Sequence, residues 1–168
     1  GNFSQIAIIL IATIAGVLPP LTPLMILFVN LVTSDFPALG LAVEKSSNDL
    51  MKQQPRNPKE EILNGYLLLK IGQVIPIIVL GTIGLFMWAL LVLNVTFETA
   101  QTVAFVSVIM FMLFHGLNAK SINGSVFSKD MFSNIFFYGG FLLSLVSTYA
   151  VLYMPVVADI FGTVPLTL

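Results

Sequence analysis

The sequence predicts an all-α fold, a polytopic membrane helical bundle with about five transmembrane helices. Of its 168 residues, 57% are hydrophobic and 9% are charged, whereas about a quarter of the residues in a soluble domain are charged. Several apolar runs reach the roughly 20 residues that a helix needs to cross a bilayer. Because lipid cannot hydrogen-bond to the backbone, such runs must form helices, and they are too uniformly apolar for the strands of a barrel.

Residues 1–43 hold the first two predicted spans. The first apolar stretch, residues 6–20, is short for a span, and the second, residues 21–43, contains a single acid, Asp35. No basic region precedes the first stretch, so we expect no signal peptide. The short first span and the odd number of spans lead us to expect a chain that is truncated at both ends.

A polar segment, residues 44–65, follows the second span. It holds four of the seven basic residues and four of the eight acids, and Pro55 and Pro58 oppose a continuous helix. We therefore expect a soluble loop. Three more spans are predicted within residues 66–158, and residues 159–168 form a tail. The apolar runs that predict these spans are residues 71–97, 99–119 and 131–158.

The basic residues predict how the chain crosses the membrane. All seven lie between spans two and three or between spans four and five, and short cytoplasmic loops collect Lys and Arg. We therefore expect an integral, multi-pass membrane protein with loops 44–65 and 119–130 in the cytoplasm. The net charge of −1 indicates no nucleic-acid partner, and the absence of cysteine excludes thiolate metal sites.

The second span carries the residues with the clearest chemistry, namely Asn30, Thr33, Ser34 and Asp35, just before Pro37. An acid inside a span is expensive and indicates a functional site. Pro37 lacks an N–H, so in an α-helix the Thr33 carbonyl would lose its usual partner. Amide, hydroxyl, carboxylate and carbonyl oxygens are the ligands that Ca²⁺ and similar ions accept.

A second interpretation of Asp35 stays open, in which the carboxylate is hydrated near the loop and merely ends the helix. At roughly 100° per residue, Asn30, Thr33 and Ser34 share one face, but Asp35 lies about 140° from Asn30. All four converge only if the helix unwinds near Pro37, as interrupted spans do around ion sites.

The run PLMILFVNLVTSDFPALGLAVE resembles the sixth transmembrane segment of type II P-type cation ATPases, which has the pattern Asn-Leu-Val-Thr-Asp-x-x-Pro-Ala. The loop LMKQQPRNPKEEILNG is similar to the segment that follows in that family, and MFMLFHGLNAKSINGSVF resembles the end of the eighth segment. The resemblance covers essentially the whole chain, from midway through the fifth segment to just before the tenth.

The resemblance implies that residues 1–168 form the carboxyl-terminal transmembrane domain of an ATP-driven pump for Ca²⁺ or another cation. The partners are then the lipid bilayer, the missing amino-terminal transmembrane segments and the cytoplasmic phosphorylation domain. ATP and Mg²⁺ would act only in the full-length protein, and this segment alone should hydrolyse nothing. The alternative function is a stand-alone, non-enzymatic membrane module, such as a channel or a regulatory subunit.

The resemblance also implies a set of cation ligands. The family has an aspartate at the position of Ser34, and here an aspartate follows one residue later; Met112 stands where some calcium pumps have a glutamate. Because each lost carboxylate removes a charge that would offset the desolvation of an ion, a two-calcium site is not expected, and one divalent ion, a monovalent ion or a proton stays open. The expected ligands are Asn2, Gln5, Asn30, Thr33, Ser34 and Asp35.

Overall fold

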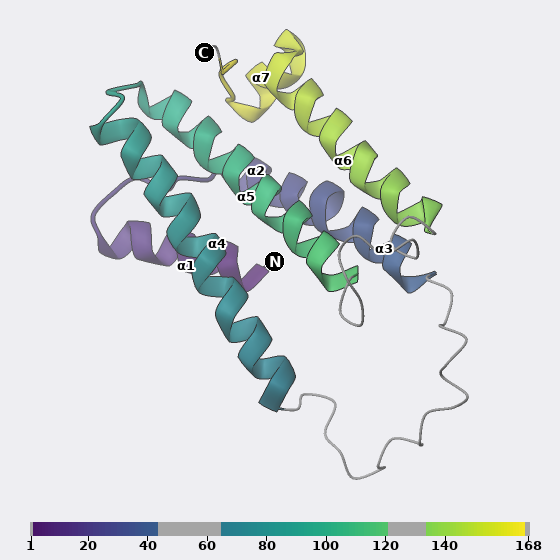
Figure 1. The fold of residues 1–168 in the computed structure, drawn as a ribbon. Helices are drawn as coiled ribbons and strands as arrows, with labels where there is room; N and C mark the ends of the chain where they lie inside the picture. The colour runs from purple at the N-terminus through teal and green to yellow at the C-terminus, as the bar shows by residue number, and fades with distance from the viewer. Residues whose placement is uncertain (1, 44–64, 121–133, 167–168) are drawn as a thin grey trace, which may run out of the picture.

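A computed structural model describes residues 2–43, 65–120 and 134–166, and these residues form a bundle of helices (Figure 1). The all-α prediction is confirmed. The predicted cytoplasmic loops 44–65 and 119–130 lie almost wholly outside the described residues. The elements are α1 (Asn2–Ile14), α2 (Pro23–Phe28), η1 (Val29–Asp35), α3 (Phe36–Ala42), α4 (Gly65–Leu91), α5 (Phe97–Lys120), α6 (Ile135–Tyr153) and α7 (Pro155–Phe161).

Four helical stretches among the described residues are long and apolar enough to cross a membrane, and the chain is an integral, multi-pass membrane protein. The first of the five expected spans, residues 6–20, is not among these four stretches. Helix α1 has 13 residues, which extend about 20 Å at 1.5 Å per residue and fall short of a hydrocarbon core of about 30 Å. The four stretches are Pro23–Gly40, Gly72–Leu91, Phe97–Asn118 and Ile135–Tyr153.

The second span is composed of α2, η1 and α3, which follow one another without a gap. Thr22 caps its start, since the Thr22 Oγ1 accepts a hydrogen bond from the Met25 N–H at 3.3 Å, and Pro23 occupies the first turn, where its missing N–H does no harm. The middle of the span, η1, is a π-helix of seven residues. This span is therefore wider in its centre than an ordinary helix.

The last apolar run is not the single helix that the sequence predicted over residues 131–158. Helix α6 ends at Tyr153, Met154 is extended (φ −86°, ψ 114°), and α7 begins at Pro155. A residue before proline avoids the α conformation, so Pro155 forces this break. Gly162, in the left-handed conformation (φ 65°), ends α7.

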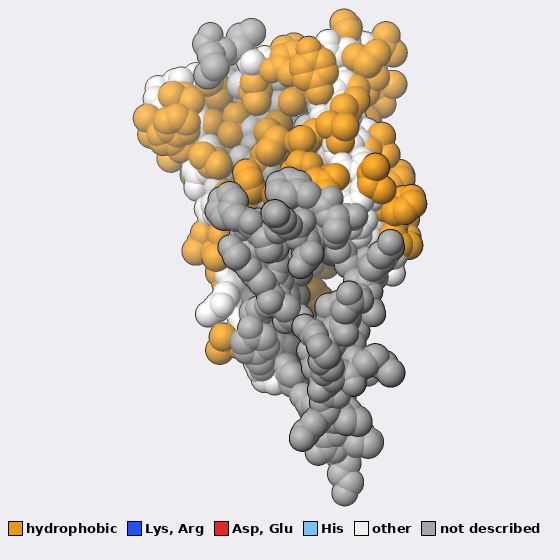
Figure 2. All heavy atoms as spheres, turned by 45° about the vertical axis from the view of Figure 1, so that its right-hand side comes forward, with side chains coloured by type: hydrophobic (Ala, Val, Ile, Leu, Met, Phe, Trp, Pro, Cys, Tyr) orange, Lys and Arg blue, Asp and Glu red, His pale blue; other side chains and the backbone are white. Residues whose placement is uncertain are grey.

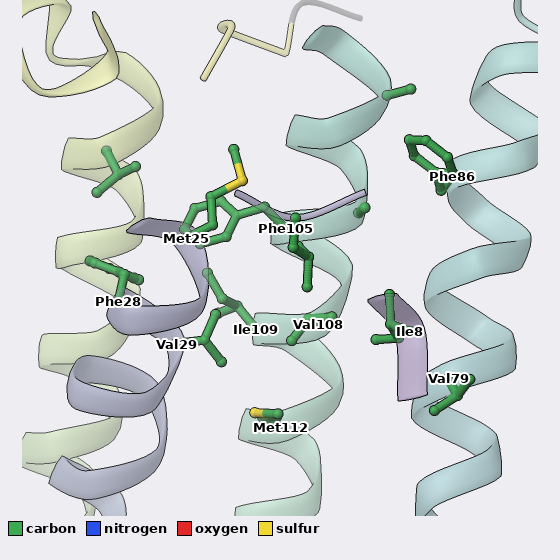
Figure 3. Close-up of a cluster of buried hydrophobic side chains, with 14 of the residues drawn as sticks. Ile8, Met25, Phe28, Val29, Val79, Phe86, Phe105, Val108, Ile109 and Met112 are labelled. Atoms are coloured by element: carbon green, nitrogen blue, oxygen red, sulfur yellow. The ribbon is translucent and has the colours of Figure 1, made fainter. Parts of the chain in front are cut away.

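Helix α5 lies at the centre of the hydrophobic core. Its buried Phe105 and Ile109 face α2 and η1 on one side, while Val108 points toward Ile8 of α1, which packs near α4, on the other (Figure 3). Many large apolar side chains of the described helices are exposed, and they cover much of the described surface on the face that Figure 2 shows. Soluble monomers rarely expose large continuous apolar patches, so this exterior suits a lipid environment.

Helices α3 and α6 cross at the distance of main-chain contact, because two glycines meet the opposite backbone. A Cβ on Gly40 would overlap the Phe137 Cα and lie 2.6 Å from the Phe137 N, and a Cβ on Gly140 would lie 2.8 Å from the Phe36 carbonyl oxygen. Small residues at such crossings are typical of membrane helices. Asn134 strengthens the crossing, since its Nδ2 donates to the Gly40 carbonyl at 2.7 Å.

The crossing generates a prediction about stability. Gly40→Ala places a methyl group against backbone that cannot move aside, so we expect a loss of about 1–3 kcal/mol, the usual effect of overpacking. Gly139→Ala is the matched control, since a Cβ there meets nothing within 4 Å. Thermal unfolding of the intact protein in detergent measures both variants. Equal midpoints for the two would contradict the close approach.

Candidate cation site

The candidate site lies around η1, where polar side chains of the second span face α1 and α5. Gln5 of α1 is 2% exposed, and its Nε2 donates a hydrogen bond to the Asn30 Oδ1 at 3.0 Å. Two of the predicted ligands from different spans are therefore in direct contact. The bond ties the short helix α1 to the centre of the second span.

Thr33 is buried, with 2% of its surface exposed, and its Oγ1 has no hydrogen-bond partner among the described residues. Leaving a buried hydroxyl without a partner costs about 1–3 kcal/mol, so native proteins seldom do so without a functional reason. The Ser4 Oγ, next to Gln5 in the chain, is likewise buried and unpartnered within the described part of the structure. Both hydroxyls lie on the helices that the Gln5–Asn30 bond joins.

Ser34 faces α5, where its Oγ donates to the Met112 Sδ at 3.6 Å. Met112 is 8% exposed, so the thioether closes this side of the site with a large apolar group. A thioether is only a weak hydrogen-bond acceptor. Met112, which stands where some calcium pumps have a glutamate, therefore lies against η1.

The π-helical register changes which carbonyl Pro37 leaves without a donor. In an α-helix the residue at position 37 would serve the Thr33 carbonyl, as the sequence suggested, but in the i→i+5 pattern of a π-helix it would serve the carbonyl of Val32. Because η1 ends at Asp35 and Pro37 lies in α3, the missing N–H at position 37 withholds a donor from the Thr33 oxygen in the α pattern and from the Val32 oxygen in the π pattern. The Ser144 Oγ of α6 donates to the Val32 oxygen at 2.7 Å.

Two of the predicted ligands are not brought to the cluster within the described chain. Asn2 and Asp35 are both exposed, and α3 continues directly from η1, so the helix widens instead of unwinding near Pro37. Asn30, Thr33 and Ser34 therefore meet the interior of the bundle while Asp35 faces outward.

Acidic side chains are sparse in the described residues. Within residues 2–43, 65–120 and 134–166, no group of three or more His, Cys, Asp or Glu side chains could hold a metal ion. Glu98 and Asp159 line a separate recess with Gln101, near the start of α5. The oxygens that face the interior of the bundle from η1 and α1 are therefore neutral amide and hydroxyl groups, which hard cations accept as ligands, whereas the carboxylate of Asp35 is exposed.

Sequence reasoning missed Ser144, although this residue contacts the main chain of η1. A serine within an apolar helix usually bonds to the carbonyl four residues before it, and nothing in the local sequence distinguishes Ser144 from such a residue. The sequence identified Ser34 as a candidate ligand. It could not predict the contact of Ser34 with Met112, because that contact depends on how α5 packs against η1.

The Gln5–Asn30 bond generates a prediction that a double-mutant cycle can measure. Gln5→Ala and Asn30→Ala should be coupled by about 0.5–1.5 kcal/mol in the free energy of unfolding, the usual net contribution of one hydrogen bond. The matched pair Asn2→Ala and Asn30→Ala should be additive, because Asn2 is exposed. Denaturant unfolding of the intact protein in micelles gives both values. Additive effects for Gln5 and Asn30 would show that the bond is not formed.

Residues 18–168 match the family described as Cation transporting ATPase, C-terminus. The chain is 34% identical over 166 residues to a calcium-transporting ATPase of Bacillus subtilis (strain 168), an alignment that covers 99% of this chain and 18% of that protein. It is 31% identical over 162 residues to the calcium-transporting ATPase type 2C member 2 of Rattus norvegicus, covering 96% of this chain and 17% of that protein.

The human calcium-transporting ATPase type 2C member 1 is 32% identical over 167 residues, which are 99% of this chain and 18% of that protein. The chain thus spans less than a fifth of the length of the relatives that it matches.

Proposed function

Because the chain belongs to the family of cation-transporting ATPase carboxyl-terminal regions, we propose that it supplies cation ligands to an ATP-driven pump. The observation that carries this proposal is the unpartnered, buried Thr33 hydroxyl, which lies on the π-helical segment beside the Gln5–Asn30 hydrogen bond. A cation bound there would give this hydroxyl oxygen a partner. π-Helical segments occur frequently at functional sites.

The side chains around η1 suit a hard cation. Gln5, Asn30, Thr33 and Ser34 each carry a neutral oxygen, and Ca²⁺ takes six to eight oxygen ligands at 2.3–2.6 Å. We propose that the transported ion is Ca²⁺, because the relatives named above are calcium-transporting ATPases. The remaining ligands would come from segments of the longer protein, since this chain spans only a small part of its relatives.

Charge favours a single divalent ion. Asp35 is the acid of the second span. Met112, which contacts Ser34, stands where some calcium pumps have a glutamate, so a second carboxylate is missing there. We propose that Asp35, exposed in this chain, faces a membrane segment outside residues 1–168 and neutralises the ion from that side. Asn2 is proposed to complete the site at the start of α1.

We propose that ATP is hydrolysed by domains outside this chain and that the chain's cytoplasmic loops contact them. Loops 44–65 and 119–130 would be cytoplasmic, as the positions of the basic residues indicate, and the first loop would contact the phosphorylation domain on which ATP and Mg²⁺ act. The relatives are ATPases, which favours this function over a stand-alone channel or regulatory subunit.

A charge-neutralising substitution tests the proposal. Asp35→Asn keeps the shape of the side chain and deletes its charge, and an uncompensated ion in a low-dielectric site costs several kcal/mol. We therefore expect Asp35→Asn to abolish Ca²⁺-dependent phosphorylation of the intact pump, or to weaken it by about 100-fold or more, without lowering expression. Asn30→Ala and Thr33→Ala, which each remove one neutral ligand, should weaken the Ca²⁺ affinity less.

Asp159→Asn serves as the matched control, because Asp159 is an exposed acid of α7 that does not line the site. It should leave the Ca²⁺ affinity unchanged. Normal Ca²⁺ affinity and transport in Asp35→Asn would remove Asp35 from the site.

A further inference from the structure

Ser144 joins α6 to the π-helical segment. The residue is fully buried, and its Oγ lies 2.7 Å from the Val32 carbonyl oxygen and 2.9 Å from the Gly140 carbonyl oxygen. The second contact is the ordinary bond of a helical serine to the residue four positions before it. The first is unusual, because it supplies a side-chain donor to the main chain of another helix.

The Val32 carbonyl needs this donor only when the segment is π-helical. In an α-helix the N–H of Phe36 would serve the Val32 oxygen, and the carbonyl without a donor would be that of Thr33. In the i→i+5 pattern the N–H of residue 37 would serve Val32, and Pro37 has none. A hydroxyl placed on Val32 therefore stabilises the π register over the α register.

The register decides where the polar side chains of the second span point. A shift of one residue turns a helix by about 100°, which is enough to move Asn30, Thr33 and Ser34 off the face where they lie. In the π register Asn30 meets Gln5 and Ser34 meets Met112. Any group that fixes this register therefore also fixes the geometry of the ligands.

The α3–α6 crossing holds Ser144 at the required distance. Gly140, one turn before Ser144, lies against the backbone at Phe36 and Pro37, and Gly40 lies against the backbone of Phe137. The Asn134 Nδ2 adds a hydrogen bond to the Gly40 carbonyl at 2.7 Å. Because the two backbones touch, α6 cannot withdraw its hydroxyl from η1 without a shift of the whole helix.

We propose that Ser144 is a positioning residue for cation binding, whose hydroxyl replaces the main-chain donor that Pro37 lacks and keeps Val29–Asp35 in the π register. The proposal rests on the cation-binding function proposed above. Ser144 itself is buried against α3 and η1 and acts on the ligands only through the backbone of the second span.

The test measures Ca²⁺-dependent phosphorylation of the intact pump. Ser144→Ala should weaken the apparent Ca²⁺ affinity by about three- to tenfold, the loss expected for one hydrogen bond, with the maximal phosphoenzyme level unchanged. Ser144→Thr, which keeps the hydroxyl, should restore the affinity to within about twofold. Ser107→Ala is the matched control, because the Ser107 Oγ donates to the Val103 carbonyl of its own helix.

A second background separates positioning from packing. Pro37→Ala restores the N–H at position 37, which in the π pattern can serve the Val32 carbonyl in place of the outside donor. In that background Ser144→Ala should change the Ca²⁺ affinity by less than about twofold, so that the two substitutions are coupled. The proposal would be overturned if Ser144→Ala weakened the Ca²⁺ affinity equally in both backgrounds. It would also be overturned if Ser144→Thr and Ser107→Ala weakened the affinity as much as Ser144→Ala does.

Asn30→Ala and Thr33→Ala, measured in the same assay, distinguish this inference from the proposed site. If both weaken the affinity while Ser144→Ala does not, the positioning role alone is wrong. If none of the three changes the affinity, the cation site itself is wrong, and the positioning role is wrong with it.

Discussion

Pro37 cannot donate a main-chain hydrogen bond, and the arrangement of the second span follows from the position of the carbonyl that this leaves unserved. If the i→i+5 pattern of the π-helical segment Val29–Asp35 continued, that carbonyl would belong to Val32, and a buried hydroxyl from α6 bonds to the Val32 oxygen at 2.7 Å. The wider helix presents Asn30 to α1 and Ser34 to α5. A single missing N–H thus links the backbone register to the grouping of polar side chains in an otherwise apolar bundle.

Packing around the segment supports this arrangement from two sides. On one side, the core built on α5 buries α2 and the start of η1 (Figure 3). On the other, the glycines at positions 40 and 140 let α3 and α6 touch along their backbones. The polar groups between them are few, and the buried Thr33 hydroxyl is left without a partner among the described residues. Such an oxygen is expensive to keep unless it binds a ligand.

Much of the fold could be predicted from the sequence, because the length of an apolar run determines whether a helix can cross a bilayer. The polar residues of the second span stood out because they interrupt an apolar run. Local sequence could not reveal the π register or the contact of Ser144 with Val32, since both depend on how α6 packs against α3. The break at Met154 was missed because hydrophobicity alone does not report the conformational restriction that Pro155 imposes.

The most direct test of the cation site is an experimental structure of the intact protein with bound Ca²⁺. We predict Ca²⁺ within about 2.3–2.6 Å of the side-chain oxygens of Asn30 and Thr33, with the segment Val29–Asp35 still π-helical. Ca²⁺ held entirely by residues outside this segment, or a segment in the α register with its polar side chains turned away from α1 and α5, would contradict the account.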